Sequence, residues 1–269
     1  MRERIVLSNL RKLARRNLES HPQMVVFAHD LVSHEIAARG LYEADLLHSI
    51  FSSPGFNTDI YNGACLDIGA NIGNHSVFFA REFSEVLAFE PNPLTAQLLQ
   101  INVRAWPNVR TLQFGLSTQT GDALLQPGTF NVGGSKIVSQ NTGDCMPIRL
   151  ERLDTVIDTL EIPVTFIKLD VEGHECDALK GGEVTINEAL PIILFEQHAK
   201  DFQNGTSPTI ELLKSWGYQF FTRDDNGSPI FRPRPSRKWH REMSFVEKYY
   251  PGILAAHPMG HKIWTDDEH

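Results

Sequence analysis

The sequence predicts an α/β protein with a doubly wound, mostly parallel sheet. Two observations predict this class. First, several segments, such as 64–68, 163–170 and 191–196, are uniformly apolar. Second, these segments alternate with segments whose apolar residues recur at helical spacing. Strands that are apolar along their whole length are typical of a parallel sheet that helices cover on both faces. The chain has 269 residues, 41% of them hydrophobic, which is enough for a large core without disulfide support.

The N-terminal part is expected to be a helical lead-in over residues 1–60, followed by the sheet domain over 61–269. Residues 1–19 carry six basic side chains beside apolar residues at helical spacing, which predicts a basic amphipathic helix. Such a helix either packs on the domain or serves a membrane surface or organelle targeting. A short apolar strand from Met24 and a helix through 43–50 are expected next.

Strands and helices alternate from residue 64. The expected strands are 64–68, 86–90, 109–114, 163–170, 191–196 and 218–222. The expected helices are 76–83, 94–105, one through Leu179 that stops at Gly181-Gly182, and one from about 208 to 216.

Two segments interrupt this alternation, and both are interpreted as loop insertions. The first, about 117–150, is rich in Gly, Ser, Thr, Asn and Gln and ends in a short strand at 146–150. Its glycine-rich part is expected to be a lid or acceptor loop, or else a flexible linker. The polar contacts expected there are Asn131, Ser135 and Lys136.

The second insertion, about 224–242, contains a basic run at 232–241. This run either binds an acidic substrate, a phosphate or RNA, or is a solvated loop.

Composition excludes several classes. Twenty-five Lys and Arg against 33 Asp and Glu give a net charge of −8, which argues against nucleic acid as the main partner. Cys65, Cys145 and Cys176 are widely spaced and form no CxxC pair, so a reducing cytoplasmic compartment is expected. No apolar run approaches the ~20 residues of a membrane span. The oligomeric state stays open, with a homodimer among the options.

A cofactor site is predicted where the first two expected strands end. Gly69-Ala70-Asn71-Ile72-Gly73 follows the first strand, and its glycines allow the backbone to turn closely around a ligand into a helix N-terminus. Glu90 ends the second strand, 21 residues after Gly69, where a carboxylate can accept hydrogen bonds from ribose hydroxyls. The alternative for Glu90 is a solvated strand end.

The nucleotide is predicted to lack a pyrophosphate. Asn71 and Asn74 stand where a dinucleotide fingerprint has its second and third glycines. Asp67 adds a negative charge that would repel a pyrophosphate but suits a positively charged sulfonium bearing an amino group. S-adenosylmethionine has these features and a ribose. The alternative for Asp67 is a helix N-cap or a carboxylate that braces the loop.

Several segments resemble the motifs of FkbM-type class I S-adenosylmethionine-dependent methyltransferases. They are 66–73 (LDIGANIG), 89–91 (FEP), 167–175 (IKLDVEGHE), 179–182 (LKGG), 152–156 (RLDTV), 191–196 (PIILFE) and 40–43 (GLYE). The resemblance covers about residues 30–222. It implies a seven-stranded, Rossmann-like methyltransferase fold and methyl transfer from S-adenosylmethionine, usually to an oxygen of a small molecule or sugar. The expected cofactor-binding residues are Asp67, Gly69, Ala70, Asn71, Gly73, Asn74, Glu90, Pro91 and Asp170.

Candidate catalytic residues follow the fourth expected strand. An acceptor hydroxyl must be aligned with the methyl group and must lose a proton, which calls for a base or a metal. Lys168 and Asp170 share a strand face, and an ion pair between them would keep Asp170 ionised. Asp170 is therefore the first candidate for the reaction centre, while Glu172 caps the next helix or binds the cofactor amino group. The alternative is that all three only brace the turn.

His198, after the fifth expected strand, is the second candidate base because its ordinary pKa is about 6.5. The alternative is a structural histidine. No ligand spacing demands a metal, and a metal site would need Asp170, Glu172, Glu196 and His198 to fold together. Two other functions stay open: an NAD-dependent oxidoreductase, and a non-catalytic S-adenosylmethionine-binding subunit.

Overall fold

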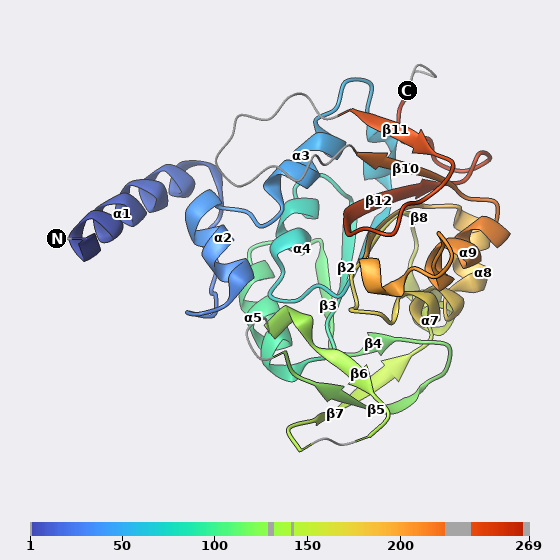
Figure 1. The fold of residues 1–269 in the computed structure, drawn as a ribbon, viewed down its shortest axis with the longest axis horizontal. Helices are drawn as coiled ribbons and strands as arrows, with labels where there is room; N and C mark the ends of the chain where they lie inside the picture. Colours follow the sequence, from blue (N-terminus) through green and yellow to red (C-terminus); the bar gives the residue numbers. More distant parts are fainter. Residues whose placement is uncertain (1, 129–131, 141–142, 224–237, 266–269) are drawn as a thin grey trace.

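The computed structural model describes residues 2–128, 132–140, 143–223 and 238–265, and its centre is one large twisted sheet (Figure 1). The strand order is β11-β10-β12-β9-β8-β1-β2-β3. Five neighbouring strands run parallel: β3 (Val109–Leu112), β2 (Glu85–Phe89), β1 (Ala64–Ile68), β8 (Val164–Leu169) and β9 (Ile192–Gln197). The remaining strands pair antiparallel: β12 (Tyr250–Ala256), β10 (Gln219–Arg223) and β11 (Trp239–Glu242).

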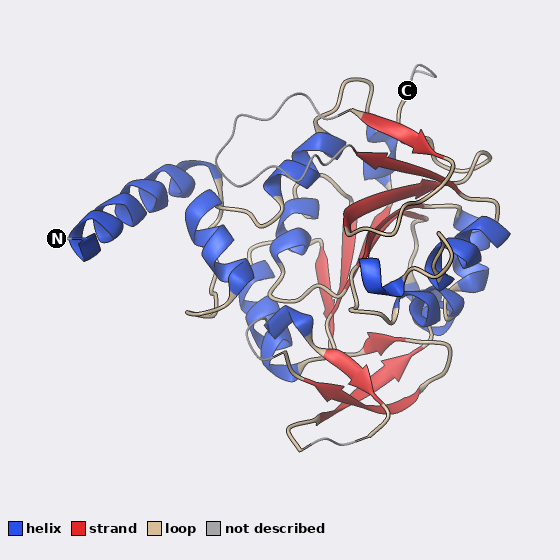
Figure 2. Cartoon of the chain, in the orientation of Figure 1, coloured by secondary structure: helices blue, strands red, loops and turns tan. Residues whose placement is uncertain are grey.

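Helices cover both faces of this sheet (Figure 2). On one face lie α3 (Ala44–Phe51), α4 (Asn74–Phe79) and α5 (Pro93–Val103). On the other lie α6 (Leu153–Val156), α7 (Glu175–Lys180), α8 (Glu183–Ala189) and α9 (Pro208–Ser215). Because each face buries its own apolar cluster, the central strands are buried on both sides. The predicted doubly wound α/β fold is confirmed.

The strand order reverses at β1, which lies between β2 and β8. In an open parallel sheet the crevice outside such a switch point is where ligands bind. The carboxyl ends of β1, β2, β8 and β9 meet at this edge and position the site described below.

The sheet has eight strands where seven were expected. The extra edge strand, β11, is the end of the predicted loop insertion at 224–242 and pairs with β10. Trp239 anchors it, since its indole is buried and Nε1 donates to the Ser49 carbonyl at 3.1 Å. Residues 224–237, which include most of the arginine-rich run, lie outside the described residues.

The insertion at 117–150 contains a second sheet, so the prediction of a loop was wrong except for its last strand. The strand order is β4-β7-β5-β6, with β4 (Gly115–Leu116), β5 (Gly121–Gln126), β6 (Lys136–Val138) and β7 (Met146–Glu151). A small core of Leu125, Ile148 and Leu150 holds it. Asn131 lies outside the described residues.

The lead-in consists of α1 (Arg2–Ser20), α2 (Leu31–Arg39) and α3. The strand expected from Met24 is absent from the described structure, where α2 follows an irregular segment. Asp30 caps α2, because its Oδ2 accepts from the Ser33 amide at 3.1 Å. Leu47 and Ile50 of α3 are fully buried in the cluster beneath the sheet, so the later lead-in joins the main core. None of the described helices has the length and apolar character needed to cross a membrane.

Candidate functional site

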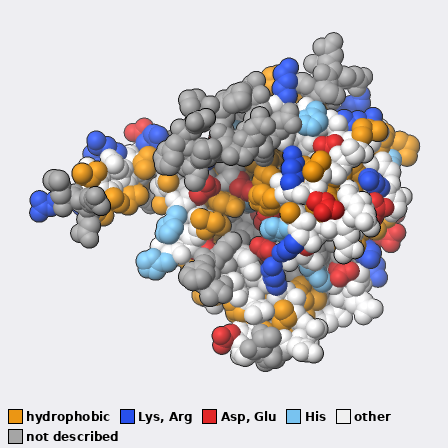
Figure 3. Space-filling model, in the orientation of Figure 1, with side chains coloured by type: hydrophobic (Ala, Val, Ile, Leu, Met, Phe, Trp, Pro, Cys, Tyr) orange, Lys and Arg blue, Asp and Glu red, His pale blue; other side chains and the backbone are white. Residues whose placement is uncertain are grey.

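A cavity opens at the carboxyl ends of β1, β2, β8 and β9, with α2 and the second sheet contributing to its walls. In Figure 3, acidic and hydrophobic side chains gather at the hollow in this face. Ten of the residues predicted to bind the cofactor or to act in catalysis line the cavity: Gly69, Ala70, Asn71, Asn74, Glu90, Pro91, Lys168, Asp170, Glu172 and His198. Asp67 and Gly73 do not line it.

The glycine turn after β1 is required by close packing. Gly69 has φ +81°, and a Cβ there would lie 1.8 Å from the Asp170 carbonyl oxygen. Gly73 has φ +89°, and its Cβ would lie 2.7 Å from Leu99 Cδ1 of α5. The two glycines therefore fit the turn against β8 and α5, and Gly69 also lines the cavity whereas Gly73 does not.

Glu90 is fixed at the end of β2 by backbone amides. Its Oε2 accepts from the Asn71 amide at 2.9 Å, and its Oε1 accepts from the Asn92 amide at 2.8 Å. Burial raises the pKa of Glu90 to about 7, against the opposing effect of these two hydrogen bonds. A carboxylate oxygen has two lone pairs, so each oxygen can accept a further hydrogen bond from the cavity side.

Asp67 lies behind the cavity wall and is fully buried. Its Oδ2 accepts from Ser76 Oγ at 2.6 Å, and its Oδ1 lies 3.5 Å from Lys168 Nζ. The geometry therefore supports a bracing carboxylate instead of the direct cofactor contact expected from the sequence.

The side chain of Asn74 also forms hydrogen bonds within the protein. Its amide side chain accepts from the Tyr42 amide at 2.9 Å and donates to the Tyr42 carbonyl at 3.1 Å. Tyr42 itself lines the cavity, and the next residue, Glu43, pairs with His75 at 3.2 Å. Asn74 thus attaches the lead-in to the site and places an aromatic ring in its wall.

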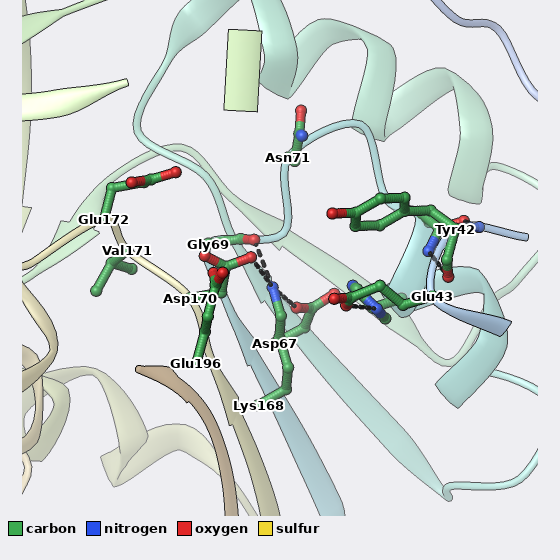
Figure 4. Close-up of polar contacts among 12 residues, drawn as sticks. Tyr42, Glu43, Asp67, Gly69, Asn71, Lys168, Asp170, Val171, Glu172 and Glu196 are labelled. Carbon is green, nitrogen blue, oxygen red and sulfur yellow. Dashed lines mark hydrogen bonds and ion pairs between the residues drawn. The ribbon is translucent and has the colours of Figure 1, made fainter. Parts of the chain in front are cut away.

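Lys168 is the centre of a buried charge network (Figure 4). Its Nζ donates to the Gly69 carbonyl at 2.9 Å and lies 3.5 Å from both Asp67 and Asp170. Burial alone would lower the pKa of Lys168, but the Asp170 and Asp67 carboxylates raise it above its ordinary value. Lys168 therefore stays protonated, and the predicted ion pair with Asp170 is confirmed.

Carboxyl and imidazole groups meet at the β8 and β9 end of the cavity. Glu196 interacts with Asp170 and Tyr249, and burial followed by the Asp170 charge raises the pKa of Glu196 to about 8. His198 Nε2 lies 3.6 Å from Glu172 and 3.8 Å from Glu196. Two neighbouring carboxyl groups, such as those of Glu196 and Asp170, do not both ionise readily, so Glu196 retains its proton near neutral pH.

Two of these residues were missed as proton-handling groups. The sequence suggests Glu196 only as a conditional metal ligand, although it lies in β9, next to the strand that Asp170 follows. Tyr249 carries no sequence signal, because β12 brings it beside β9 from more than fifty residues away. Within the described ranges, no group of three or more His, Cys, Asp or Glu side chains is arranged to hold a metal ion.

The opposite end of the cavity is apolar. Phe89, Leu116, Leu125 and Ile137 line it, the last three from the second sheet. Ser135 lines the cavity as well, and Lys136 Nζ lies 3.9 Å from Glu172 Oε2. The cavity thus joins an apolar end next to Glu90 with a carboxyl-rich end around Asp170.

Comparison with known proteins adds a family match. The model of the methyltransferase FkbM domain matches residues 67–220. The hexuronic acid methyltransferase AglP of Haloferax volcanii is 36% identical over 135 residues, which are 49% of this chain and 55% of that protein. The chain therefore aligns with about half the length of this relative.

Two further matches are more distant. Methyltransferase sdnD of Sordaria araneosa is 28% identical over 200 residues, 61% of this chain and 76% of that protein. The crystal structure of methyltransferase FkbM from Methylobacillus flagellatus superposes with a TM-score of 0.47 at 17% identity, covering 93% of this chain and 58% of that one.

Proposed function

The chain belongs to the FkbM methyltransferase family, and we propose that it transfers a methyl group from S-adenosylmethionine to a hydroxyl oxygen of a sugar or similar small molecule. The observation that carries this proposal is the cavity itself. Its apolar part lies next to Glu90, a carboxylate that can accept hydrogen bonds from ribose hydroxyls, and it continues to the interacting carboxyl groups of Asp170 and Glu196. The hexuronic acid methyltransferase among the relatives favours a sugar acceptor.

The nucleoside end suits S-adenosylmethionine, which supplies the transferable methyl group when bound. Glu90 is held where it can accept hydrogen bonds from hydroxyl groups, and Phe89 and Leu116 offer an apolar surface for a purine ring. A pyrophosphate would need cationic partners. Lys168 is the only lysine or arginine among the described residues that line the cavity, and its ammonium is already shared between two carboxylates. This distribution of charge disfavours an NAD-dependent oxidoreductase.

The acceptor end suits removal of a hydroxyl proton. Lys168 Nζ lies 3.5 Å from Asp170 Oδ2, and the Asp170 charge raises the basicity of Glu196. Glu196 therefore acts as the general base, with a pKa close to working pH, where a general base is most effective. Tyr249 interacts with Glu196 and acts to lower its pKa, against the effect of burial. Asp170 holds the acceptor and tunes the base.

His198 is the alternative base at this end. Its Nε2 is buried without a hydrogen-bond partner in the described structure and lies near Glu172 and Glu196.

The test is turnover with a panel of neutral sugars, amino sugars and uronic acids, each incubated with S-adenosylmethionine. We expect S-adenosylhomocysteine to form only with particular acceptors, and mass spectrometry to find one added methyl group on oxygen. Calorimetry should detect S-adenosylhomocysteine binding and no comparable binding of NAD. Tight NAD binding without a response to S-adenosylhomocysteine would refute the proposal. Cofactor binding without turnover on any acceptor would favour the non-catalytic subunit.

A further inference from the structure

Helix α1 presents a surface that the other described residues of the chain do not cover. It extends away from the body in Figure 1, and residues 4–12 are all exposed. Only its last turns contact α2, where Asn17 Nδ2 donates to the Ala37 carbonyl at 3.2 Å and Leu13 is half-buried. The first part of α1 therefore contributes little to the packing of the body.

The exposed part of α1 carries an apolar stripe. Leu7, Leu10 and Leu18 are 54%, 43% and 61% exposed, and together with Ala14 they recur every three or four residues, on one side of the helix. In Figure 3, hydrophobic and basic side chains share the surface of α1. A continuous exposed stripe of this kind is typical of a surface that binds a partner.

The charges beside the stripe indicate which kind of partner this surface fits. Arg4, Arg11 and Arg15 are seven and four residues apart and form a row along its edge. Residues 1–20 contain six basic and two acidic residues, whereas the rest of the chain contains 19 basic and 31 acidic ones. A second copy of α1 would bring like charges together. Anionic lipid headgroups would pair with the arginines, while the leucines enter the edge of the acyl layer.

We propose that α1 docks the chain on an anionic membrane surface through the Leu7, Leu10 and Leu18 stripe and the arginine row beside it. Docking would hold the cavity close to the bilayer, because α1 packs on α2, and Leu31 and Val32 of α2 line the cavity.

Vesicle flotation of the full chain tests the proposal. We expect it to bind vesicles that contain about 30% phosphatidylglycerol at least ~10-fold more tightly than neutral phosphatidylcholine vesicles, and to dissociate as salt rises. Leu7→Glu and Arg11→Glu should each weaken binding by about tenfold or more.

Two matched controls should bind normally. Met259→Glu changes a side chain that is 82% exposed on another surface, and Arg104→Glu makes the same charge change at the residue that follows α5. The proposal is overturned if the chain ignores anionic vesicles at low salt, or if variants and controls bind alike. It is also overturned if sedimentation finds a dimer that Leu7→Glu dissolves. The assay contains neither cofactor nor acceptor, so its outcome is independent of methyl transfer.

Discussion

The two ends of the cavity use their polar groups differently. At the β1 and β2 end, Glu90 accepts from two backbone amides, and Asn74 forms two hydrogen bonds to the Tyr42 backbone. At the β8 and β9 end, Asp170, Glu196 and His198 face mainly other ionisable side chains. Groups fixed by backbone hydrogen bonds suit recognition of a constant ligand. Groups that share protons with one another suit a change of charge during a reaction.

Glu196→Gln should produce the largest effect, because it removes the proposed base while keeping its shape. We expect kcat to fall by about 10²–10⁴, with little change in the affinity for S-adenosylhomocysteine. Steady-state kinetics and calorimetry provide the two readouts. Glu188→Gln on the exposed side of α8 is the control and should retain the parental rate. A comparable loss of cofactor affinity would instead assign Glu196 to the cofactor site.

Gly69→Ala should test the turn that joins the two ends. Its Cβ would meet the Asp170 carbonyl, and its φ is +81°, so we expect a loss of about 3 kcal/mol in the free energy of unfolding. Gly173→Ala is a matched control, because Gly173 has φ +98° with no atom within 4 Å of the added Cβ. It should lose only about 1 kcal/mol. Denaturant titration measures both, and equal losses would mean that the contact with Asp170 imposes no constraint.

Glu90→Ala should affect only the β1 and β2 end of the cavity. Loss of a carboxylate that accepts hydrogen bonds from the ribose hydroxyls should weaken S-adenosylhomocysteine binding by about 1.5–3 kcal/mol. Glu85→Ala, at the start of the same strand, removes only a partly exposed pair with Arg110 and should leave affinity unchanged. An unchanged dissociation constant for Glu90→Ala would show that Glu90 does not hold the ribose.

The sequence predicted the edge of the sheet at which the site lies, because polar residues such as Glu90 and Asp170 follow apolar strands. It did not predict which side chains face the cavity. Asp67 lies directly opposite Lys168 in the β1–β8 register, so the buried ammonium competes for its carboxylate. That register is a tertiary property and is not visible in either strand alone.

The second sheet and Tyr249 escaped prediction for related reasons. Strands β5 to β7 are short and lie among glycines and polar residues, so the composition of the whole segment looks like that of a loop. Tyr249 reaches the site because Tyr250 pairs with Gln197 across antiparallel strands. Contacts between strands so far apart in the chain follow from pairing, which local patterns do not encode.

The pH dependence of kcat in the parental chain and in Asp170→Asn tests the central claim most directly. If Glu196 is the base, the parental rate should rise with pH to a plateau, with an apparent pKa near 8. Removing the Asp170 charge takes away one cause of the raised pKa, so the rise should move to lower pH and the plateau rate should fall. Asp122→Asn changes an exposed side chain on β5 and should leave the profile in place. A rise that stays at the same pH in Asp170→Asn would contradict the account.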